Sequence, residues 1–351
     1  MPPKIEMPSL LNFRDLVGLR RSINVSHGIN ELKTFIDFEA FREKLEALCH
    51  YGKKGRPHYD VVKMFKILIL QTFYNLSDEE MEYQLSDRLS FQEFVGIGYA
   101  DDIPDARTIW IFRERLGDTG VKGLFDLFYA QMKAKGLKCS KRKLIDATFQ
   151  EAKEQKNTSA ENAYVKETET APAEWSKKKA AHKDVDASWT KKRGVTHYGY
   201  KGHVLADEKS KTIENYKTTI ASVHDSQVCA ELLPENAREE KLEVLADSGY
   251  FGRKVSKSLH KKGVKARIIQ RRVRGQQDLT LTQKCRNKAI ARRRCRIEHI
   301  FGAIKHFGRD TFRAVGLKRC KIRQGLVFLL YNMKRFRFLC RTGELCPVDT
   351  K

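Results

Sequence analysis

The stretch from Ile290 to Phe307, IARRRCRIEHIFGAIKHF, decides how the rest of this sequence is interpreted. It has no proline and a single glycine, Gly302, so we predict a helix over it. At 3.6 residues per turn, three isoleucines share one apolar face: Ile297, Ile300 and Ile304. A neighbouring face carries residues spaced by four, three and four: Arg294, Glu298, Phe301 and Lys305. One carboxylate thus lies beside the buried edge of the helix, between two cations.

Two interpretations of this face are open. An exposed Arg–Glu–Lys ladder on an amphipathic helix is common and contributes little. Two aspartates upstream favour a functional site instead. Asp146 lies within KLIDATF (143–149), an alternating strand-like run, and Asp247 ends the apolar run LEVLAD (242–247). A buried aspartate costs free energy unless it is paired or binds a cation.

Composition narrows the class of partner. The chain has 351 residues, with 68 Lys and Arg against 44 Asp and Glu, a net charge of +24 and a pI near 9.7. Such a charge predicts a polyanionic partner, most simply nucleic acid. No apolar run approaches the roughly 20 residues that span a bilayer. The eight cysteines contain no C-x2-C pair, which indicates reduced thiols and argues against disulfides and a zinc knuckle.

The first part of the chain is predicted to be an all-α domain, residues 1–137. Val61–Phe73 is apolar almost all round, as in a central buried helix. Ser77 begins a capping box, Asp105 starts another helix and Gly117 stops it. Short helices with exposed cations are compatible with a helix-turn-helix that binds DNA ends; the cations are Arg107, Arg113 and Arg115. The alternative is an ordinary small bundle.

The second part is predicted to be an α/β domain, residues 138–345. A polar segment at about 150–196 lacks apolar periodicity and reads as an exposed insertion. Within it, Trp175 and Trp189 could stack on nucleic acid or anchor the loop. Segments 198–207 and 212–220 are predicted to form a β-hairpin. Asp225 and Ser226 are predicted to cap the helix that follows.

The order of these elements predicts an RNase H-like catalytic domain. The order is a strand with Asp146, the insertion, two strands, a helix, a strand with Asp247, a helix at 252–261, a strand at 264–270 and the helix with Glu298. In that fold the first and fourth of these strands are adjacent. Three carboxylates that meet there cannot all stay ionised without cations. Oxygen ligands of this kind suit two Mg²⁺ or Mn²⁺ ions.

Four motifs resemble the DDE transposases of bacterial insertion sequences, specifically the insertion-sequence-5 family. GRPHYDVVKMFKILILQTFYNLSDEEME and IPDARTIWIFRERL look like the N-terminal domain of that family, DATF its first catalytic motif and ADSGYFG its second. RCRIEHIFGAIK resembles the signature Y-x2-R-x3-E-x6-K, which Arg294, Glu298 and Lys305 match. The tyrosine position is Ala291 here, a departure. The resemblance covers about residues 40–340.

The resemblance implies a retroviral-integrase-like transposase. It would cleave DNA at the terminal inverted repeats of its element with Mg²⁺ and transfer the 3′ ends into target DNA. Asp146, Asp247 and Glu298 would be catalytic and bind the metal ions. The expected DNA contacts are Arg294, Lys305, Arg293, Arg296, Arg107 and Arg113.

The resemblance also implies a homodimer on paired DNA ends, in the bacterial cytoplasm at the nucleoid, with no membrane partner. Two alternatives remain open. One is a nuclease of the same fold without strand transfer, and the other is a catalytically inactive DNA-binding regulator derived from a transposase.

Overall fold

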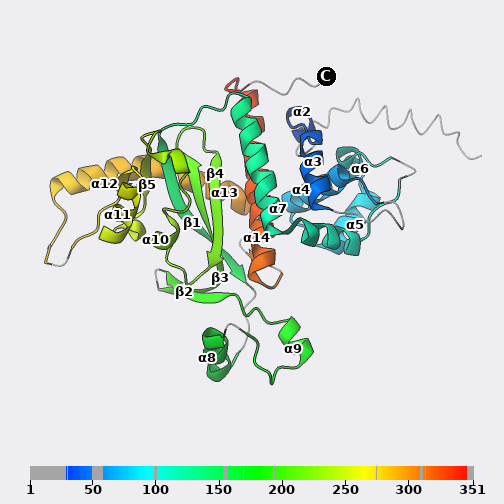
Figure 1. Cartoon of the computed structure of the whole chain (residues 1–351), viewed down its shortest axis with the longest axis horizontal. Helices are drawn as coiled ribbons and strands as arrows, with labels where there is room; N and C mark the ends of the chain where they lie inside the picture. Colours follow the sequence, from blue (N-terminus) through cyan, green and yellow to red (C-terminus); the bar gives the residue numbers. More distant parts are fainter. Residues whose placement is uncertain are drawn as a thin grey trace, which may run out of the picture.

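A computed structural model of the chain describes residues 29, 31–49, 58–98, 101–152, 157–168, 170–192, 194–273, 275–308, 311–312 and 314–345. Its N-terminal part is helical (Figure 1). The helices there are α2 (Leu32–Phe35), η1 (Glu39–Phe41), α3 (Arg42–Leu48), α4 (Val61–Tyr74), α5 (Asp78–Asp87), α6 (Leu89–Val95) and α7 (Ala106–Ala134).

Capping side chains lie at the start of three of these helices, and the sequence predicted two of them, Ser77 and Asp105. Asp60 accepts hydrogen bonds from the N–H groups of Val62 and Lys63 at the start of α4. Ser77 caps α5 and Asp105 caps α7 in the same way. The predicted stop at Gly117 is confirmed, because its backbone (φ 62°, ψ 179°) leaves the helical region and interrupts α7, which then continues as a second helical segment to Ala134. Its second half resumes because it has its own buried apolar face: Val121, Leu124, Phe125, Phe128 and Met132.

The described strands form one mixed sheet. They are β1 (Arg142–Ala152), β2 (Ser188–Lys192), β3 (Val195–Asp207), β4 (Ile213–Ile220), β5 (Glu243–Ala246), β6 (Lys265–Ile268) and β7 (Thr311–Phe312). β3 pairs antiparallel with β1 on one side and with β2 and β4 on the other. β1, β5 and β6 are parallel neighbours. The meander followed by parallel strands, with β1 beside β5, confirms the predicted RNase H-like order.

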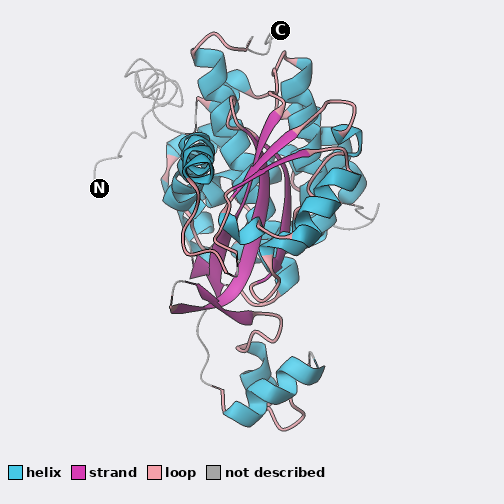
Figure 2. Cartoon of the chain, turned by 90° about the vertical axis from the view of Figure 1, so that its left-hand side faces the viewer, coloured by secondary structure: helices cyan, strands magenta, loops and turns pink. Residues whose placement is uncertain are grey.

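Helices cover both faces of the sheet (Figure 2). The helices of this part of the chain that follow β1 are α8 (Ser159–Thr168) and α9 (Lys177–Ala181), which lie beyond one end of the sheet, and α10 (Asp225–Val228), α11 (Arg253–Lys261), α12 (Leu281–Arg294), α13 (Arg296–Gly308) and α14 (Leu317–Arg341), with short 3-10 turns η2 (Glu235–Ala237) and η3 (Ser248–Tyr250). Successive residues of β1 point to opposite faces. Leu144 packs in the core with α13 and α14, and Ile145 in a second core with α10 and α11.

The N-terminal helices and the sheet share one apolar core through α14. The Phe128 ring of α7 lies 5.8 Å from the Phe336 ring of α14, edge to face. Phe125 of α7 similarly meets Tyr216 of β4 at 4.9 Å. Fifteen residues of α14 are buried. The predicted boundary at residue 137/138 therefore falls inside a shared core, and it stays a prediction about which part performs which task.

The polar segment after β1 carries a small lobe at one end of the sheet (Figure 2). None of the residues of α8 and α9 is buried. Trp175 is only 8 % exposed, and its Nε1–H donates to Glu161 of α8 at 2.7 Å. This tryptophan therefore holds the lobe together. Trp189 of β2 is 46 % exposed and lies against Tyr198, with ring centroids 4.8 Å apart.

The predicted cap at Asp225 and Ser226 is wrong. His224 occupies the N-cap position of α10, and its Nδ1 lies 3.3 Å from the Ser226 N–H. Asp225 instead pairs with Lys201 of β3 at 3.0 Å, a partner that is distant in the sequence. The helix also ends at Val228 rather than near Leu233.

The buried histidine His203 of β3 should make the stability of the folded protein depend on pH. Its Nε2 lies 2.8 Å from the Thr219 hydroxyl, and within the described part of the chain Nδ1 has no hydrogen-bond partner. Burial lowers the pKa of His203 from 6.5 to about 4, against the opposing effect of Asp225. The folded state therefore resists protonation where the unfolded chain accepts it. The contribution of the neutral His203 to stability is fully present above pH 6.5 and is lost as the pH falls towards 4.

Because of this histidine, we expect the free energy of unfolding to fall by about 1 kcal/mol when the pH is lowered from 6.5 to 5.5. Denaturant unfolding of wild type and His203→Gln at the two pH values measures it. The variant should lack this component of the pH dependence, because glutamine does not titrate. An unchanged pH dependence in the variant would show that His203 is not the group responsible.

Candidate active site at the ends of strands β1 and β5

The parallel register of β1 and β5 brings two aspartates together. Ile145 of β1 pairs with Ala246 of β5, and Asp146 and Asp247 are the residues that directly follow this pair. Asp146 points to the same face of the sheet as Leu144, and Asp247 to the same face as Leu245. This is the face on which α13 and α14 pack. The structure thus places the two predicted aspartates side by side, as the strand order implied.

The turn after β5 orients the Asp247 carboxylate. Its Oδ1 accepts a hydrogen bond of 2.8 Å from the Gly249 N–H and caps η3. Burial acts to raise the pKa of Asp247, but hydrogen bonds from Gly249 and Ser248 and the nearby Arg294 and Arg271 lower it below its ordinary value. Asp247 is therefore a carboxylate at neutral pH, and its side chain is 40 % exposed.

Arg294 bridges the two aspartates. Its Nη2 donates to Asp146 Oδ2 in a short ion pair and lies 4.0 Å from Asp247 Oδ2. The side chains of Arg294 and Asp146 are only 15 % and 16 % exposed. The buried Nε of Arg294 has no hydrogen-bond partner among the described residues. Within the protein Arg294 thus pairs with Asp146 instead of forming a ladder with Glu298.

The predicted single helix is divided in two at Cys295. α12 ends at Arg294 and α13 begins at Arg296, although the backbone of Cys295 stays in the right-handed helical region (φ −53°, ψ −20°). The predicted apolar face of α13 is confirmed, because its three isoleucines are buried: Ile297, Ile300 and Ile304. These residues anchor α13 on the sheet face that holds Asp146.

Glu298 lies exposed in the first turn of α13. In the described part of the chain, its carboxylate takes part in no hydrogen bond or ion pair. The same residues contain no group of three His, Cys, Asp or Glu side chains gathered closely enough to hold a metal ion. The structure therefore brings Asp146 and Asp247 together and leaves Glu298 outside their contact. Lys305, two turns later, lines a small cavity beside Thr148 and Phe149, further along β1 from Asp146.

The other cations predicted to contact DNA divide into two groups. Arg107 at the start of α7 and Arg293 near the end of α12 are exposed. Arg296 donates to the Glu208 backbone oxygen and carboxylate at 3.1 and 3.2 Å. Arg113 makes a two-pronged ion pair with Asp78, both bonds being 2.7 Å. Arg296 and Arg113 thus already have partners within the fold.

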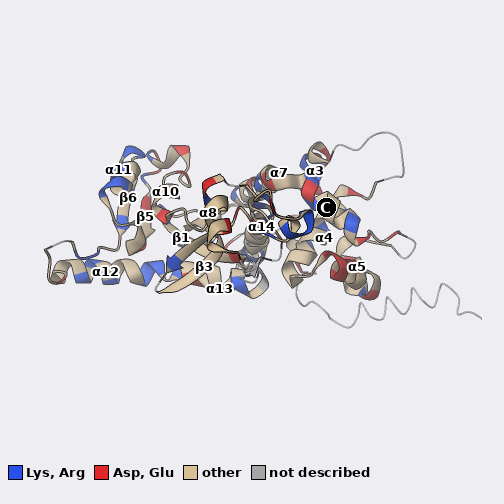
Figure 3. Cartoon of the chain, turned by 90° about the horizontal axis from the view of Figure 1, so that it is seen from below, with Lys and Arg blue, Asp and Glu red and all other residues tan. Residues whose placement is uncertain are grey.

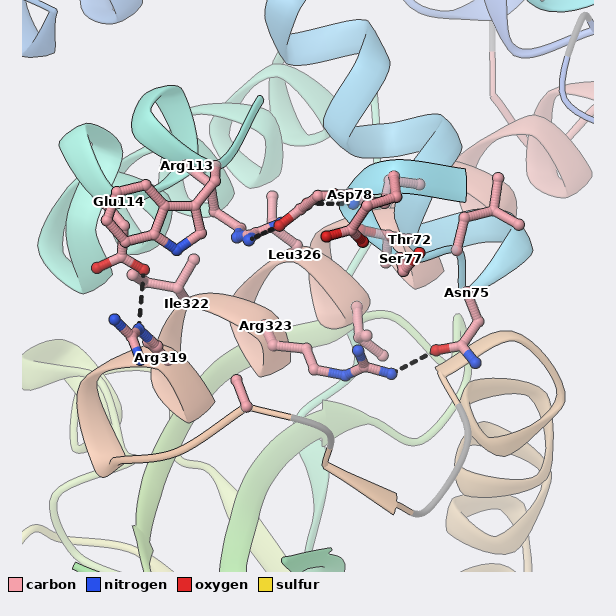
Figure 4. A pocket seen from close by; sticks show the side chains of 16 residues that line it. Thr72, Asn75, Ser77, Asp78, Arg113, Glu114, Arg319, Ile322, Arg323 and Leu326 are labelled. Carbon is pink, nitrogen blue, oxygen red and sulfur yellow. Dashed lines mark hydrogen bonds and ion pairs between the residues drawn. The ribbon is translucent and has the colours of Figure 1, made fainter. Parts of the chain in front are cut away.

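Arg113 lies at a cavity of about 280 Å³ between α4, α5, α7 and α14 (Figure 4). In the close-up its guanidinium points at Asp78, while Arg319 faces Glu114 and Arg323 faces Asn75. Burial would raise the pKa of Asp78, but Arg113 and Gln71 bring it below its ordinary value. This cavity contains none of the three predicted metal ligands. Its polar contacts instead join the N-terminal helices to α14.

Sequence reasoning missed Tyr250, which follows Asp247 in the turn after β5. The residue is 1 % exposed, and its hydroxyl has no hydrogen-bond partner among the described residues. Burial is the largest cause that raises the pKa of Tyr250 well above 10.0, and the negative charges of Asp146 and Asp225 raise it further. A protonated phenol therefore lies near Asp146. Its place in ADSGYFG, three residues after a strand-ending aspartate, was a usable signal.

Within the described residues, no helix has the length and apolar character needed to cross a membrane.

The chain matches two family models. One, described as a transposase domain, matches residues 18–115. The other, described as a transposase DDE domain, matches residues 138–333, more than half of the chain.

A solved structure of the piggyBac transposase synaptic complex with hairpin DNA is also similar. The sequence identity is 11 %, the TM-score is 0.45, and the match covers 90 % of this chain and 75 % of that one.

Proposed function

This chain belongs to the DDE transposase family, and from that we propose that it mobilises an insertion sequence. It would cleave DNA at the terminal inverted repeats of the element and join the 3′ ends to target DNA. The observation that carries the proposal is the pair of carboxylates, Asp146 and Asp247, aligned by the register of β1 and β5 on one face of the sheet.

The acidic pair fits a divalent cation. It already attracts a cation within the protein, since the Arg294 guanidinium is bound to Asp146 and lies 4.0 Å from Asp247. Carboxylate oxygens are the ligands that Mg²⁺ and Mn²⁺ prefer. We propose that Asp146 and Asp247 hold Mg²⁺, with two ions per site. Glu298, an exposed carboxylate one turn after Arg294, would supply the third ligand.

When bound, such ions activate an attacking water or 3′-hydroxyl and stabilise the leaving oxygen of a phosphodiester. The chain's own residues would orient the substrate. Arg294 is a planar donor that can hold a phosphate as well as a carboxylate. Lys305, beside β1 past Asp146, would hold a phosphate further along the strand. Arg293 and Arg107 are exposed and would add phosphate contacts.

The proposal extends to assembly and to the division of labour. Residues 1–137 would recognise the ends of the element, and residues 138–345 would carry out the chemistry. Two copies would act on paired ends, at the nucleoid in the bacterial cytoplasm. These points rest on the family resemblance and on the charge of +24.

Incubation with duplex DNA that carries the ends of the element, in Mg²⁺, tests the proposal by mapping of the products. We expect breaks that leave 3′-hydroxyl ends at the inverted repeats, followed by joined products with a target plasmid. Breaks without joined products would identify a nuclease of the same fold. Binding without any break in Mg²⁺ or Mn²⁺ would identify an inactive regulator.

A further inference from the structure

Helix α12 projects outward from the sheet (Figure 1), and the edge that contacts β5, β6 and α13 anchors it. Its start is stabilised locally by a capping box between Thr280 and Gln283. Asn287 exchanges two hydrogen bonds with the backbone of Gln270, at 2.9 and 3.0 Å. Ile290 is the buried residue of this helix. The remaining surface of α12 is therefore available to a partner.

This surface is strongly basic (Figure 3). α12 has no acidic residue and six cations: Lys284, Arg286, Lys288, Arg292, Arg293 and Arg294. Within the described part of the chain, four of them have no ion pair or side-chain hydrogen bond: Arg286, Lys288, Arg292 and Arg293. Lys284 pairs with the exposed Asp278, an interaction of little energetic weight.

Three of these cations form a row of exposed side chains along α12. Lys284, Lys288 and Arg292 are spaced by four and therefore lie one above the other. Like charges at this spacing repel and destabilise the helix. A partner that supplies a matching row of negative charges would relieve that repulsion.

The position of the row identifies the partner. Eight residues of helix span about 12 Å, and the row ends two residues before Arg294, the residue bound to Asp146. Phosphates of one DNA strand are spaced by about 3.4 Å along the helix axis. The row thus matches three to four nucleotide steps that begin beside the catalytic aspartates.

We propose that Lys284, Lys288 and Arg292 bind the phosphates of the DNA duplex that adjoins the cleaved bond. This inference rests on the proposed function, because it places the cleaved bond at Asp146 and Asp247. It adds a binding surface that neither the motifs nor the catalytic pair identify. Such contacts would hold the duplex in register without reading its sequence.

The test is the salt dependence of DNA binding by the full chain. The triple variant K284Q/K288Q/R292Q keeps helix-forming side chains and removes three charges. Binding of a 30-base-pair duplex in EDTA, measured by fluorescence anisotropy, excludes cleavage from the readout. We expect the slope of log affinity against log salt to become shallower by about 2 to 3, since each phosphate contact contributes about 0.9. The affinity at physiological salt should fall at least about tenfold.

The matched control is K166Q/K177Q/K178Q, which removes three exposed charges from the α8–α9 lobe. It should keep the wild-type slope within about one unit. Equal slopes for the α12 variant and wild type, with both melting cooperatively, would overturn the proposal. An equal loss in the control would also overturn it, because net charge would then explain both. Failure of the cleavage assay leaves this measurement intact, so the two proposals can fail separately.

Discussion

Asp247→Asn is expected to reduce DNA cleavage by at least about a thousandfold, or about 4 kcal/mol in activation free energy. Asparagine keeps the size of the side chain and its Oδ1 acceptor for the Gly249 N–H, so the turn after β5 should persist. It removes the negative charge that would hold the metal ion. Cleavage rates at saturating DNA in Mg²⁺ measure the effect, and DNA binding in EDTA shows whether the fold is retained.

Asp118→Asn is the matched control for this variant. Asp118 pairs with Lys321 at the surface, between α7 and α14, at 3.4 Å. Its replacement should leave cleavage unchanged, since exposed pairs contribute little. An Asp247→Asn enzyme that cleaves within tenfold of wild type would remove Asp247 from the site. Asp146→Asn should reproduce the loss, because the register gives the two carboxylates equivalent places.

Arg294→Ala is expected to have opposite effects on metal binding and on cleavage. In the protein without metal, Arg294 supplies the positive charge that compensates Asp146 and, at 4.0 Å, Asp247. Removing it leaves two neighbouring carboxylates whose repulsion an added cation would relieve. We expect the affinity for Mn²⁺ without DNA to rise about tenfold, about 1.4 kcal/mol. Cleavage should fall about a hundredfold, because the donor that would hold the phosphate is lost.

Electron paramagnetic resonance of free Mn²⁺ measures the affinity without reliance on activity. Thermal melting supplies a second readout: Arg294→Ala should melt below wild type in EDTA and regain more of its stability than wild type when Mn²⁺ is added. Arg294→Lys keeps a positive charge without the planar pair of donors. Its Mn²⁺ affinity and its melting temperature in EDTA should lie between those of wild type and Arg294→Ala. A Mn²⁺ affinity that is unchanged or weaker in Arg294→Ala would show that the guanidinium does not compete for the carboxylates.

Local pattern in the sequence determined the elements and the aspartate pair. Alternation around Asp146 predicted β1, and the apolar run that ends in Asp247 predicted β5. The isoleucine face of α13 was also readable, because helical periodicity depends on neighbours within one or two turns. The order of elements then implied that β1 and β5 are adjacent, as the register confirms. A strand order restricts which chain segments can meet.

Only the tertiary structure decided which partner each charged side chain has. Arg294 binds Asp146, 148 residues away, instead of Glu298 one turn away. Arg113 binds Asp78, and Asp225 pairs with Lys201 instead of capping a helix. The burial of α14 between the N-terminal helices and the sheet was equally absent from any local pattern. The physical reason is that periodicity assigns a side chain to a face, whereas its ion pair depends on which other face packs there and on the rotamer that this packing allows.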